Sequence, residues 1–229
     1  AILDGDGTQQ VALDGVSAEA TSDAIDPATN PVNLTAAITQ GGAVISNGDW
    51  TNGSSPYFSW DAGEDNESGV FGYCAYLGTD SMADPITTKG LLGVSPVGTG
   101  SHCQFVTPTS SLDLANPGLL GAPLVSSNDP LYLILKTIDL AGNVANTSEQ
   151  FNFRFDNTAP TNPAFITAPS GFVNSKLVSM SWPITGGNAA VDAHAGIAGL
   201  QYKIGASGTG YGDAHTGLGD SNDLLVNDG

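Results

Sequence analysis

The side chains through which this sequence could do chemistry are mostly carboxylates. The chain holds 23 acidic residues, 19 of them Asp, against 5 Lys and Arg, which gives a formal net charge of −18. Two roles fit this composition. The charges can keep an exposed surface soluble, or their oxygens can bind Ca²⁺, which takes six to eight oxygen ligands in proteins. Composition by itself favours the solvated surface.

Five oxygen-bearing side chains are the candidate Ca²⁺ ligands. They are Asp65, Asp139, Asn143, Asp156 and Asp192. Asp139 and Asn143 bound the segment Asp-Leu-Ala-Gly-Asn, which also suits a turn whose side chains bond to local backbone while Gly142 takes positive φ. Both interpretations stay open, because one residue can serve a turn and an ion together.

Catalytic motifs are not found around the histidines. His102, His194 and His215 fall in no hydrolase, zinc-protease, phosphate-binding or dinucleotide-binding pattern. His194 is close to Asp192 in sequence and could ligate or tune a metal, although an exposed loop histidine without a role is more common. We therefore expect a protein that is not an enzyme.

The charge balance also excludes classes of partner. Binding to nucleic acid depends on cationic side chains that displace counterions, and this chain has 5 Lys and Arg. An acidic membrane surface would repel the chain for the same reason. The sequence has no apolar run of about 18 residues, so direct membrane insertion of this segment is not expected.

The two cysteines, Cys74 and Cys103, lie in strand-like sequence without CxxC or His neighbours. A zinc site is therefore not expected. We predict a disulfide, and closing a loop of about 29 residues would contribute about 3 kcal/mol in the chain-entropy model. A disulfide is also what we expect of a chain in an extracellular or cell-surface setting, where disulfides persist. Two free buried thiols are the alternative.

Alternating apolar and polar residues indicate β-strands that must position these groups. The pattern is clear at Phe151–Phe155, and it recurs at 178–182 and 200–204. The run Leu131–Ile138 is almost continuously apolar, which favours a central strand covered on both faces. With 30 Gly and 13 Pro between such segments, the composition predicts an all-β fold with many turns.

An internal repeat organises the chain. Trp60 and the segment from Asp65 to Tyr73 return as Trp182 and the segment from Asp192 to Leu200, and 127 positions separate Asp65 from Asp192. The Pro-containing segment 26–31 likewise returns at 156–163. Proline stops a strand ladder, so we interpret these two segments as the joints that precede domains.

Together these motifs resemble the immunoglobulin-like and fibronectin type III-like repeats of large bacterial surface proteins. The resemblance covers about residues 27–229 and depends on Asp-x-x-Ser-Gly-Val after Trp60, on Asp-Leu-Ala-Gly-Asn, and on Asp-Asn-Thr-Ala-Pro. In a sandwich of that type the chain entry, the loop after the second strand and the last hairpin turn lie at one pole. The resemblance thus implies that Asp65, Asp139 and Asn143 lie near Asp26, and Asp192 near Asp156.

The expected fold is all-β, with tandem immunoglobulin-like β-sandwich domains, and we expect domain two to be incomplete. We assign residues 1–26 to an N-terminal arm or to the end of a preceding repeat. Residues 27–158 form the first sandwich, with a long insert at 79–129, and 159–229 form part of another one. Counterparts of 131–155 would fall beyond Gly229, so we expect either further sequence or a neighbouring subunit's arm to complete domain two.

The function that the resemblance implies is structural. We expect a non-catalytic module that presents other parts of a cell-surface protein or filament, and that Ca²⁺ stiffens at the domain joints. Its partners would be neighbouring repeats or subunits of the same protein. The alternative is an adhesin or carbohydrate-binding module that uses the 79–129 insert to bind a surface glycan or a protein, because long ordered loops often carry function.

Overall fold

The computed structural model describes residues 22–93, 110–174 and 179–200, together with the backbone of short strands outside these ranges. The chain divides into two compact units: unit 1 comprises Ala1–Leu124 and Asp129–Phe155, and unit 2 comprises Val125–Asn128 and Asp156–Gly229. The described residues form strands, turns and loops without a helix. Accordingly, no helical segment in the described part of the chain has the length and apolarity to cross a membrane.

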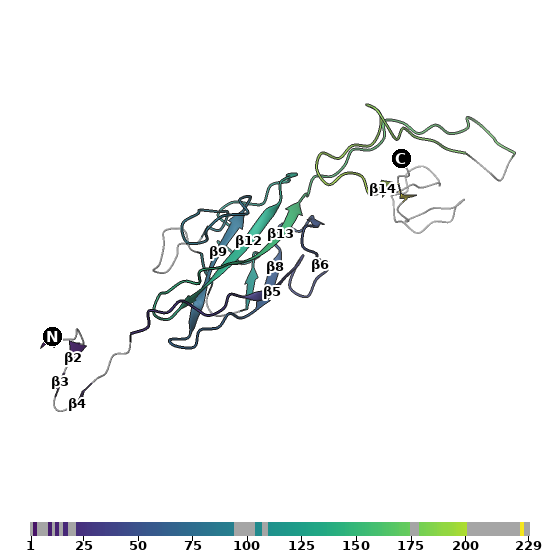
Figure 1. The fold of residues 1–229 in the computed structure, drawn as a ribbon. Coiled ribbons are helices and arrows are strands. Elements are labelled where there is room, and N and C mark those ends of the chain that lie inside the picture. Colours follow the sequence, from purple (N-terminus) through teal and green to yellow (C-terminus); the bar gives the residue numbers. More distant parts are fainter. Residues whose placement is uncertain are drawn as a thin grey trace. The chain divides into compact units, whose positions relative to one another are not determined.

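Two large sheets form the body of unit 1 (Figure 1). The five-stranded sheet has the order β10 (Gln104–Val106), β9 (Val70–Gly78), β12 (Leu131–Asp139), β13 (Glu149–Phe155) and β7 (Trp50–Thr51). The four-stranded sheet has the order β11 (Ser111–Asp113), β8 (Tyr57–Asp61), β5 (Val32–Ala37) and β6 (Val44–Ile45). All neighbours pair antiparallel except β13 and β7, which run parallel.

The two sheets enclose one apolar core, as expected for an all-β sandwich. Phe58 of β8 meets Phe151 and Phe153 of β13, with ring centroids 6.0 and 5.8 Å apart. Trp60 packs edge-on against Tyr73 at 5.5 Å. Trp60, Tyr73, Leu133, Phe153 and Phe155 are all buried in this core. The phenylalanines at 153 and 155 lie on the apolar face that the alternation at Phe151–Phe155 predicts.

Strand β12 is covered on both faces, which explains its continuous apolar run. Its odd-numbered residues from Leu131 to Leu135 belong to the core between the sheets. On the other face, Ile134 packs with Tyr76 and Ala83, and Ile138 packs in a cluster with Cys74 and Ile86. Residues 79–93 of the predicted insert supply this outer cover.

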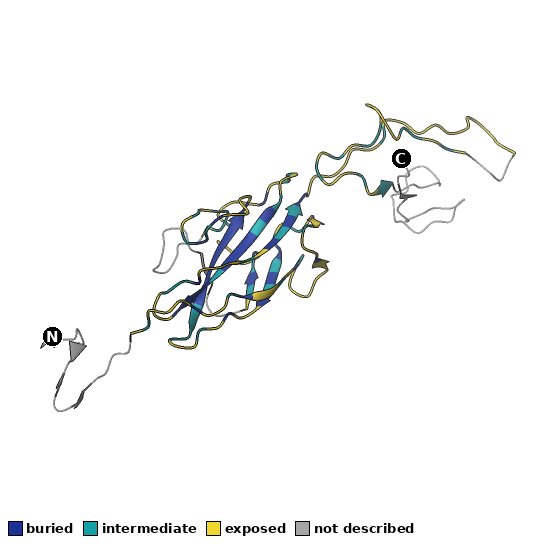
Figure 2. Ribbon diagram, viewed as in Figure 1, coloured by how far each residue is buried: buried dark blue, intermediate teal, exposed yellow. Residues whose placement is uncertain are grey.

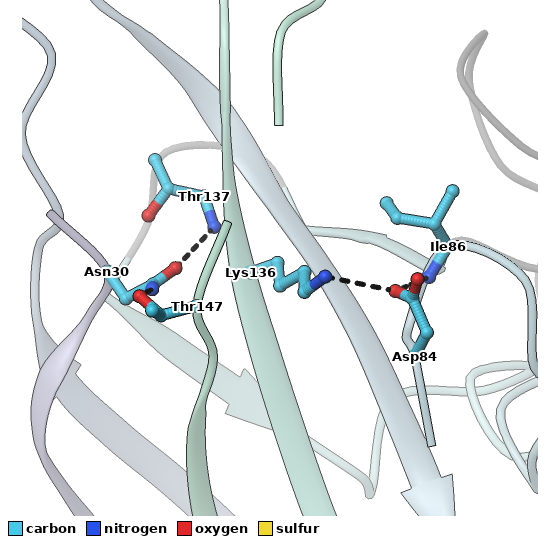
Figure 3. A network of polar contacts seen from close by, with 6 residues as sticks. All are labelled: Asn30, Asp84, Ile86, Lys136, Thr137 and Thr147. Carbon is cyan, nitrogen blue, oxygen red and sulfur yellow. Dashed lines mark hydrogen bonds and ion pairs between the residues drawn. The ribbon is translucent and has the colours of Figure 1, made fainter. Parts of the chain in front are cut away.

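Polar contacts hold the neighbouring segments on the five-stranded sheet (Figure 3). Lys136 of β12 forms an ion pair with Asp84 at 3.3 Å, and the Asp84 carboxylate also accepts a hydrogen bond from the Ile86 amide at 3.1 Å. On the entry segment, Oδ1 of Asn30 accepts from the Thr137 amide at 3.2 Å, and its Nδ2 donates to Oγ1 of Thr147 at 2.6 Å.

The insert predicted at 79–129 is more than a loop. It contains β10 and β11, and β11 pairs with β8 in the four-stranded sheet. Leu112, Leu114 and Leu124 from its second half are buried in the core between the sheets. Much of the predicted insert is therefore part of the sandwich itself.

Unit 2 differs in how little of it is buried. Among its described residues Asp156 is the only buried one, and the rest are intermediate or exposed (Figure 2). Its strands are β14 (Gly199–Leu200) and β15 (Leu225–Val226), which pair antiparallel. Of the strand predicted at 178–182, the described residues 179–182 form a bridge between Ser181 and Thr167. Val178 and residues 201–204 lie outside the described residues.

Unit 1 also includes four short strands that precede β5 in sequence. They are β1 (Ile2–Leu3), β2 (Gln9–Gln10), β3 (Ala12–Leu13) and β4 (Val16–Ser17). β1 pairs with β2, and β3 pairs with β4.

Candidate cation site

Three carboxylates from three segments of unit 1 meet at one end of the sandwich. Asp23 lies in the entry segment before β5, Asp65 lies in the loop between β8 and β9, and Asp139 is the last residue of β12. One carboxylate oxygen of each lies within 4.8 Å of the other two. Close approach of the loop depends on Gly63, because a Cβ there would fall 2.6 Å from the Thr29 carbonyl oxygen.

The turn after β12 fixes the position of Asp139. This residue is fully buried, and its Oδ1 accepts a hydrogen bond from the Asn143 amide at 2.7 Å. The Asp139 amide in turn donates to the Asn143 carbonyl at 3.1 Å, and Gly142 has φ of 96°. The turn predicted from Asp-Leu-Ala-Gly-Asn is therefore formed.

Asn143 joins this turn to the entry segment. Its Nδ2 donates to Oδ2 of Asp139 at 2.7 Å and to the carbonyls of Asp23 and Ile25 at 3.3 and 3.2 Å. The amide nitrogen thus acts as a donor that orients Asp139 and Asp23. Only the amide oxygen of Asn143 would be open to a cation.

Asp65 presents one oxygen to its own loop and keeps the other unpaired. Oδ2 accepts from the Gly69 amide at 2.6 Å and from Oγ of Ser68 at 3.4 Å. Gly69 has φ of 87°, which favours glycine at this point. Oδ1 is buried and has no hydrogen-bond partner, and an unsatisfied buried carboxylate oxygen is costly unless a cation or a donor reaches it.

Asp23 is the member of this cluster that sequence analysis missed. Its Oδ1 accepts from the Ile25 amide at 2.9 Å, and its Oδ2 accepts from the Ser68 amide at 3.2 Å. Hydrogen bonds from Ile25 and then from Ser68 lower the pKa of Asp23 below its ordinary value. Asp23 is therefore a carboxylate at neutral pH.

Asp26, around which the cluster was expected, has another role. Its Oδ2 accepts a hydrogen bond from Nδ2 of Asn146 at 2.7 Å. A signal for Asp23 does exist in the sequence, because Asp23 and Asp156 each stand four positions before a proline, Pro27 and Pro160. Aligning the two joints on this spacing would have selected Asp23.

The cluster of Asp23, Asp65 and Asp139 fits a hard divalent cation. Ligand oxygens 2.3–2.6 Å from a Ca²⁺ ion lie up to about 5 Å from one another, which agrees with mutual distances of at most 4.8 Å. The orphaned Oδ1 of Asp65 is one oxygen with no competing hydrogen bond. Such an ion would neutralise charge around the fully buried Asp139.

Unit 2 repeats this local arrangement around the predicted ligands Asp156 and Asp192. Oδ1 of Asp156 accepts from the Thr158 amide at 2.9 Å and Oδ2 accepts from the Ala195 amide at 3.0 Å. These bonds, the first being the stronger influence, lower the pKa of Asp156 from 3.8 to about 2. Oδ1 of Asp192 accepts from the Gly196 amide at 2.9 Å, as Asp65 accepts from Gly69.

The correspondence extends beyond the acids. In unit 1, the Thr29 amide donates to the Glu64 carbonyl at 3.2 Å, and the Glu64 amide donates to Oγ1 of Thr29 at 2.8 Å. In unit 2, the Thr161 amide donates to the Val191 carbonyl at 2.8 Å, and the Val191 amide donates to Oγ1 of Thr161 at 2.9 Å. The same pair of hydrogen bonds closes both joints.

Strand pairing shows the same relation. Thr35 pairs with Ser59 across β5 and β8, and Thr167 pairs with Ser181 in unit 2. Ser59 and Ser181 directly precede Trp60 and Trp182. The spacing between equivalent residues thus changes from strand to strand, which a single offset of 127 positions cannot show.

His194 lies in the same loop as Asp192. Its backbone amide donates to Oδ1 of Asp192 at 2.9 Å, and its ring Nδ1 is buried without a hydrogen-bond partner.

Cys74 is fully buried on β9 and is not a free cysteine. Cys103, His102 and His215 lie outside the described residues, so the Cys74–Cys103 pairing stays a prediction.

Comparison of the chain with protein-family models, curated proteins and solved structures found no match. Proposals about its function therefore rest on the geometry described above.

Proposed function

We propose that this chain is a non-catalytic structural module of an extracellular, cell-surface protein or filament, built from tandem immunoglobulin-like domains. One observation carries the proposal: the two joints repeat the same hydrogen bonds, from Thr29 with Glu64 in unit 1 and from Thr161 with Val191 in unit 2. A joint that recurs is typical of repeat proteins, whose units serve as spacers that present other parts of the molecule.

The strand order of unit 1 supports an immunoglobulin-like assignment. Strands β9, β12 and β13 lie side by side in one sheet, and β5, β8 and β11 lie side by side in the other. In immunoglobulin-type sandwiches the third, sixth and seventh strands share a sheet, as do the first, second and fifth. Counting β5, β8, β9, β10, β11, β12 and β13 as the seven strands reproduces that order except at the fourth strand: β10 pairs with β9 in the five-stranded sheet, whereas the fourth strand of an immunoglobulin constant-type domain lies in the other sheet.

A spacer role is favoured over an adhesin role because of how the predicted insert is used. Ala83 and Ile86 pack on the outer face of the five-stranded sheet, and Leu112 and Leu114 are buried in the core. These side chains stabilise the sandwich and are not presented to a glycan or a protein ligand. The described residues of the insert thus give no specific support to the adhesin or carbohydrate-binding alternative.

Ca²⁺ at the Asp23–Asp65–Asp139 cluster has a mechanical role in this proposal. The three acids come from the entry segment, a loop and a strand end. An ion bound to all three would hold the entry segment against the body of unit 1, because moving the segment away would break the bond between the ion and Asp23. The joint would then be stiffer with Ca²⁺ than without it.

Antibody labelling of cells that produce the natural protein tests this function. Antibodies raised against unit 1 should label intact, non-permeabilised cells, and removal of surface proteins by an external protease should abolish the signal. An antibody against a cytoplasmic protein serves as the control for cell integrity. Labelling that appears only after lysis would contradict the proposed surface location.

A further inference from the structure

Unit 2 exposes apolar residues at the positions that form the core in unit 1. By the joint and strand equivalences above, Leu34, Phe58, Trp60 and Tyr73 correspond to Ile166, Met180, Trp182 and Leu200. In unit 1, Leu34 packs against the core and the other three are buried. In unit 2, Ile166 is 62% exposed, and the other three are only partly buried.

Unit 1 shows what covers such residues. Phe58 contacts Phe151 and Phe153 of β13, and the same core includes Leu133 and Leu135 of β12. The antiparallel pair β12–β13 therefore closes the sandwich over the first strands of the unit (Figure 1). Polar Asn152 and half-buried Arg154 alternate with the phenylalanines on β13.

The strand edge of unit 2 shows the same relation to unit 1. Leu200 of β14 pairs with Leu225 of β15, as its counterpart Tyr73 of β9 pairs with Val106 of β10. On its other edge, β9 pairs along its length with β12, from Val70 to Gly78. The backbone edge of β14 opposite β15 is thus the place that corresponds to β12.

On the proposed function's premise that both units are copies of one module, we propose that this face of unit 2 is a docking surface for a β-hairpin of the β12–β13 kind. The hairpin adds antiparallel to β14, and its alternate aliphatic and aromatic side chains cover Ile166, Met180 and Trp182. The occupant is specified by chemistry: a strand that is apolar on both faces, followed by a strand that alternates aromatic and polar residues. Main-chain pairing supplies affinity and the apolar positions supply register.

The test uses the full 229-residue chain and a synthetic peptide that comprises its residues 129–157. The chain is labelled with fluorotryptophan, so Trp50, Trp60 and Trp182 each give one fluorine NMR signal, assigned with single Trp→Phe variants. Addition of the peptide should shift the Trp182 signal saturably, with a midpoint below about 1 mM. The Trp50 and Trp60 signals, which report on unit 1, should stay in place.

A matched peptide with Phe151, Phe153 and Phe155 changed to Ser is the control, and it should shift the Trp182 signal at least tenfold more weakly. Ile166→Asp in the chain should weaken binding of the unmodified peptide similarly. The proposal is overturned if neither peptide shifts Trp182, if both shift it equally, or if only Trp60 responds. It is also overturned if sedimentation shows that two copies of the chain cover this face by self-association that Ile166→Asp abolishes.

This result separates from that of the proposed function. Surface labelling of cells reports where the protein lies, whatever the Trp182 signal does. A chain that labels at the surface but does not bind the hairpin would leave the structural role standing and remove the docking surface.

Discussion

At the scale of single residues, the carboxylates of Asp139 and Asp65 are acidic groups of unit 1 whose burial needs compensation. Asp139 is fully buried, whereas Asp65 keeps one buried oxygen without a hydrogen bond. Burying ionised groups costs free energy unless hydrogen bonds and opposite charge compensate. The hydrogen bonds of Asn143 compensate in part, and a cation would supply the opposite charge.

We predict that Ca²⁺ binds unit 1 and raises its melting temperature, because the ion binds the folded arrangement of Asp23, Asp65 and Asp139. Extracellular calcium modules bind with dissociation constants of about 10⁻⁴–10⁻³ M, and saturation at about 100 times the constant would add about 2.7 kcal/mol. Calorimetric titration and thermal unfolding with and without Ca²⁺ measure both effects. Asp139→Asn should lower the affinity at least tenfold, whereas Asp49→Asn, an exposed control, should not. A calorimetric titration that detects no binding at millimolar Ca²⁺ would contradict the prediction and would mean that these acids only keep the surface soluble.

The carboxylate of Asp156 makes the joint of unit 2 sensitive to acid. Its folded-state pKa of about 2 lies below the ordinary value of 3.8, so the folded joint binds fewer protons than the unfolded chain between these values. The stabilisation is present above pH 3.8 and is lost as the pH falls toward 2. The Thr158 and Ala195 amides donate to Asp156. Their protection from hydrogen exchange, taken relative to the intrinsic exchange rate at each pH, should fall over this window in wild type and be low already at neutral pH in Asp156→Ala. Equal protection in both proteins would show that Asp156 does not hold the joint.

At the scale of elements, the side chains of β8 that pack against the five-stranded sheet hold the two sheets of the sandwich together. Trp60 is 4% exposed and lies against Tyr73. Phe58, two residues before it, contacts the phenylalanines of β13. These contacts join the two sheets, so a cavity here would weaken the whole sandwich.

We predict that Trp60→Ala destabilises unit 1 by about 3–5 kcal/mol, the usual cost of deleting a buried aromatic side chain. Denaturant unfolding followed by circular dichroism measures the change. Trp50→Ala is the matched control, because Trp50 is 36% exposed and its ring centroid lies 5.9 Å from Cζ of Arg154. Loss of the Trp50 side chain should cost less than about 1 kcal/mol of unfolding free energy. A loss below about 1 kcal/mol for Trp60→Ala would remove this residue from the core.

At the scale of the whole chain, the two units bury their side chains to very different extents. Unit 1 has an apolar core drawn from both sheets. The described residues of unit 2 include one buried residue, Asp156. Segments with few buried apolar contacts open locally at low free-energy cost.

We predict that limited proteolysis cuts unit 2 before unit 1. A protease of broad specificity at low concentration should leave a resistant fragment that begins before Val32 and ends after Phe155, because cleavage follows the population of locally open states. Mass spectrometry of the time course identifies the fragment. Addition of the 129–157 peptide should slow the cuts in unit 2 if the docking surface is real. Initial cuts within β9, β12 or β13 would contradict the stability order.

The sequence by itself determined two strands of unit 1, β12 and β13, and their buried faces. Alternation at Phe151–Phe155 and the apolar run Leu131–Ile138 carry that information locally, because side chains in a strand point to opposite faces with period two. The turn at Asp139 and Asn143 was equally predictable, because it depends on contacts four residues apart. The repeat of Asp65 at Asp192 is likewise visible in sequence.

Only the tertiary structure decided that Asp23, and not Asp26, meets Asp65 and Asp139. Asp23 is 116 positions from Asp139. Its carboxylate is positioned by hydrogen bonds from the Ser68 and Ile25 amides, and its carbonyl by a hydrogen bond from Nδ2 of Asn143. A sequence motif reports spacing along the chain, whereas a cation site depends on distances across it. The same reason explains why the residues predicted as a long insert are partly core. Leu112 and Leu114 are buried because β11 pairs with the edge of β8, a contact between segments far apart in sequence.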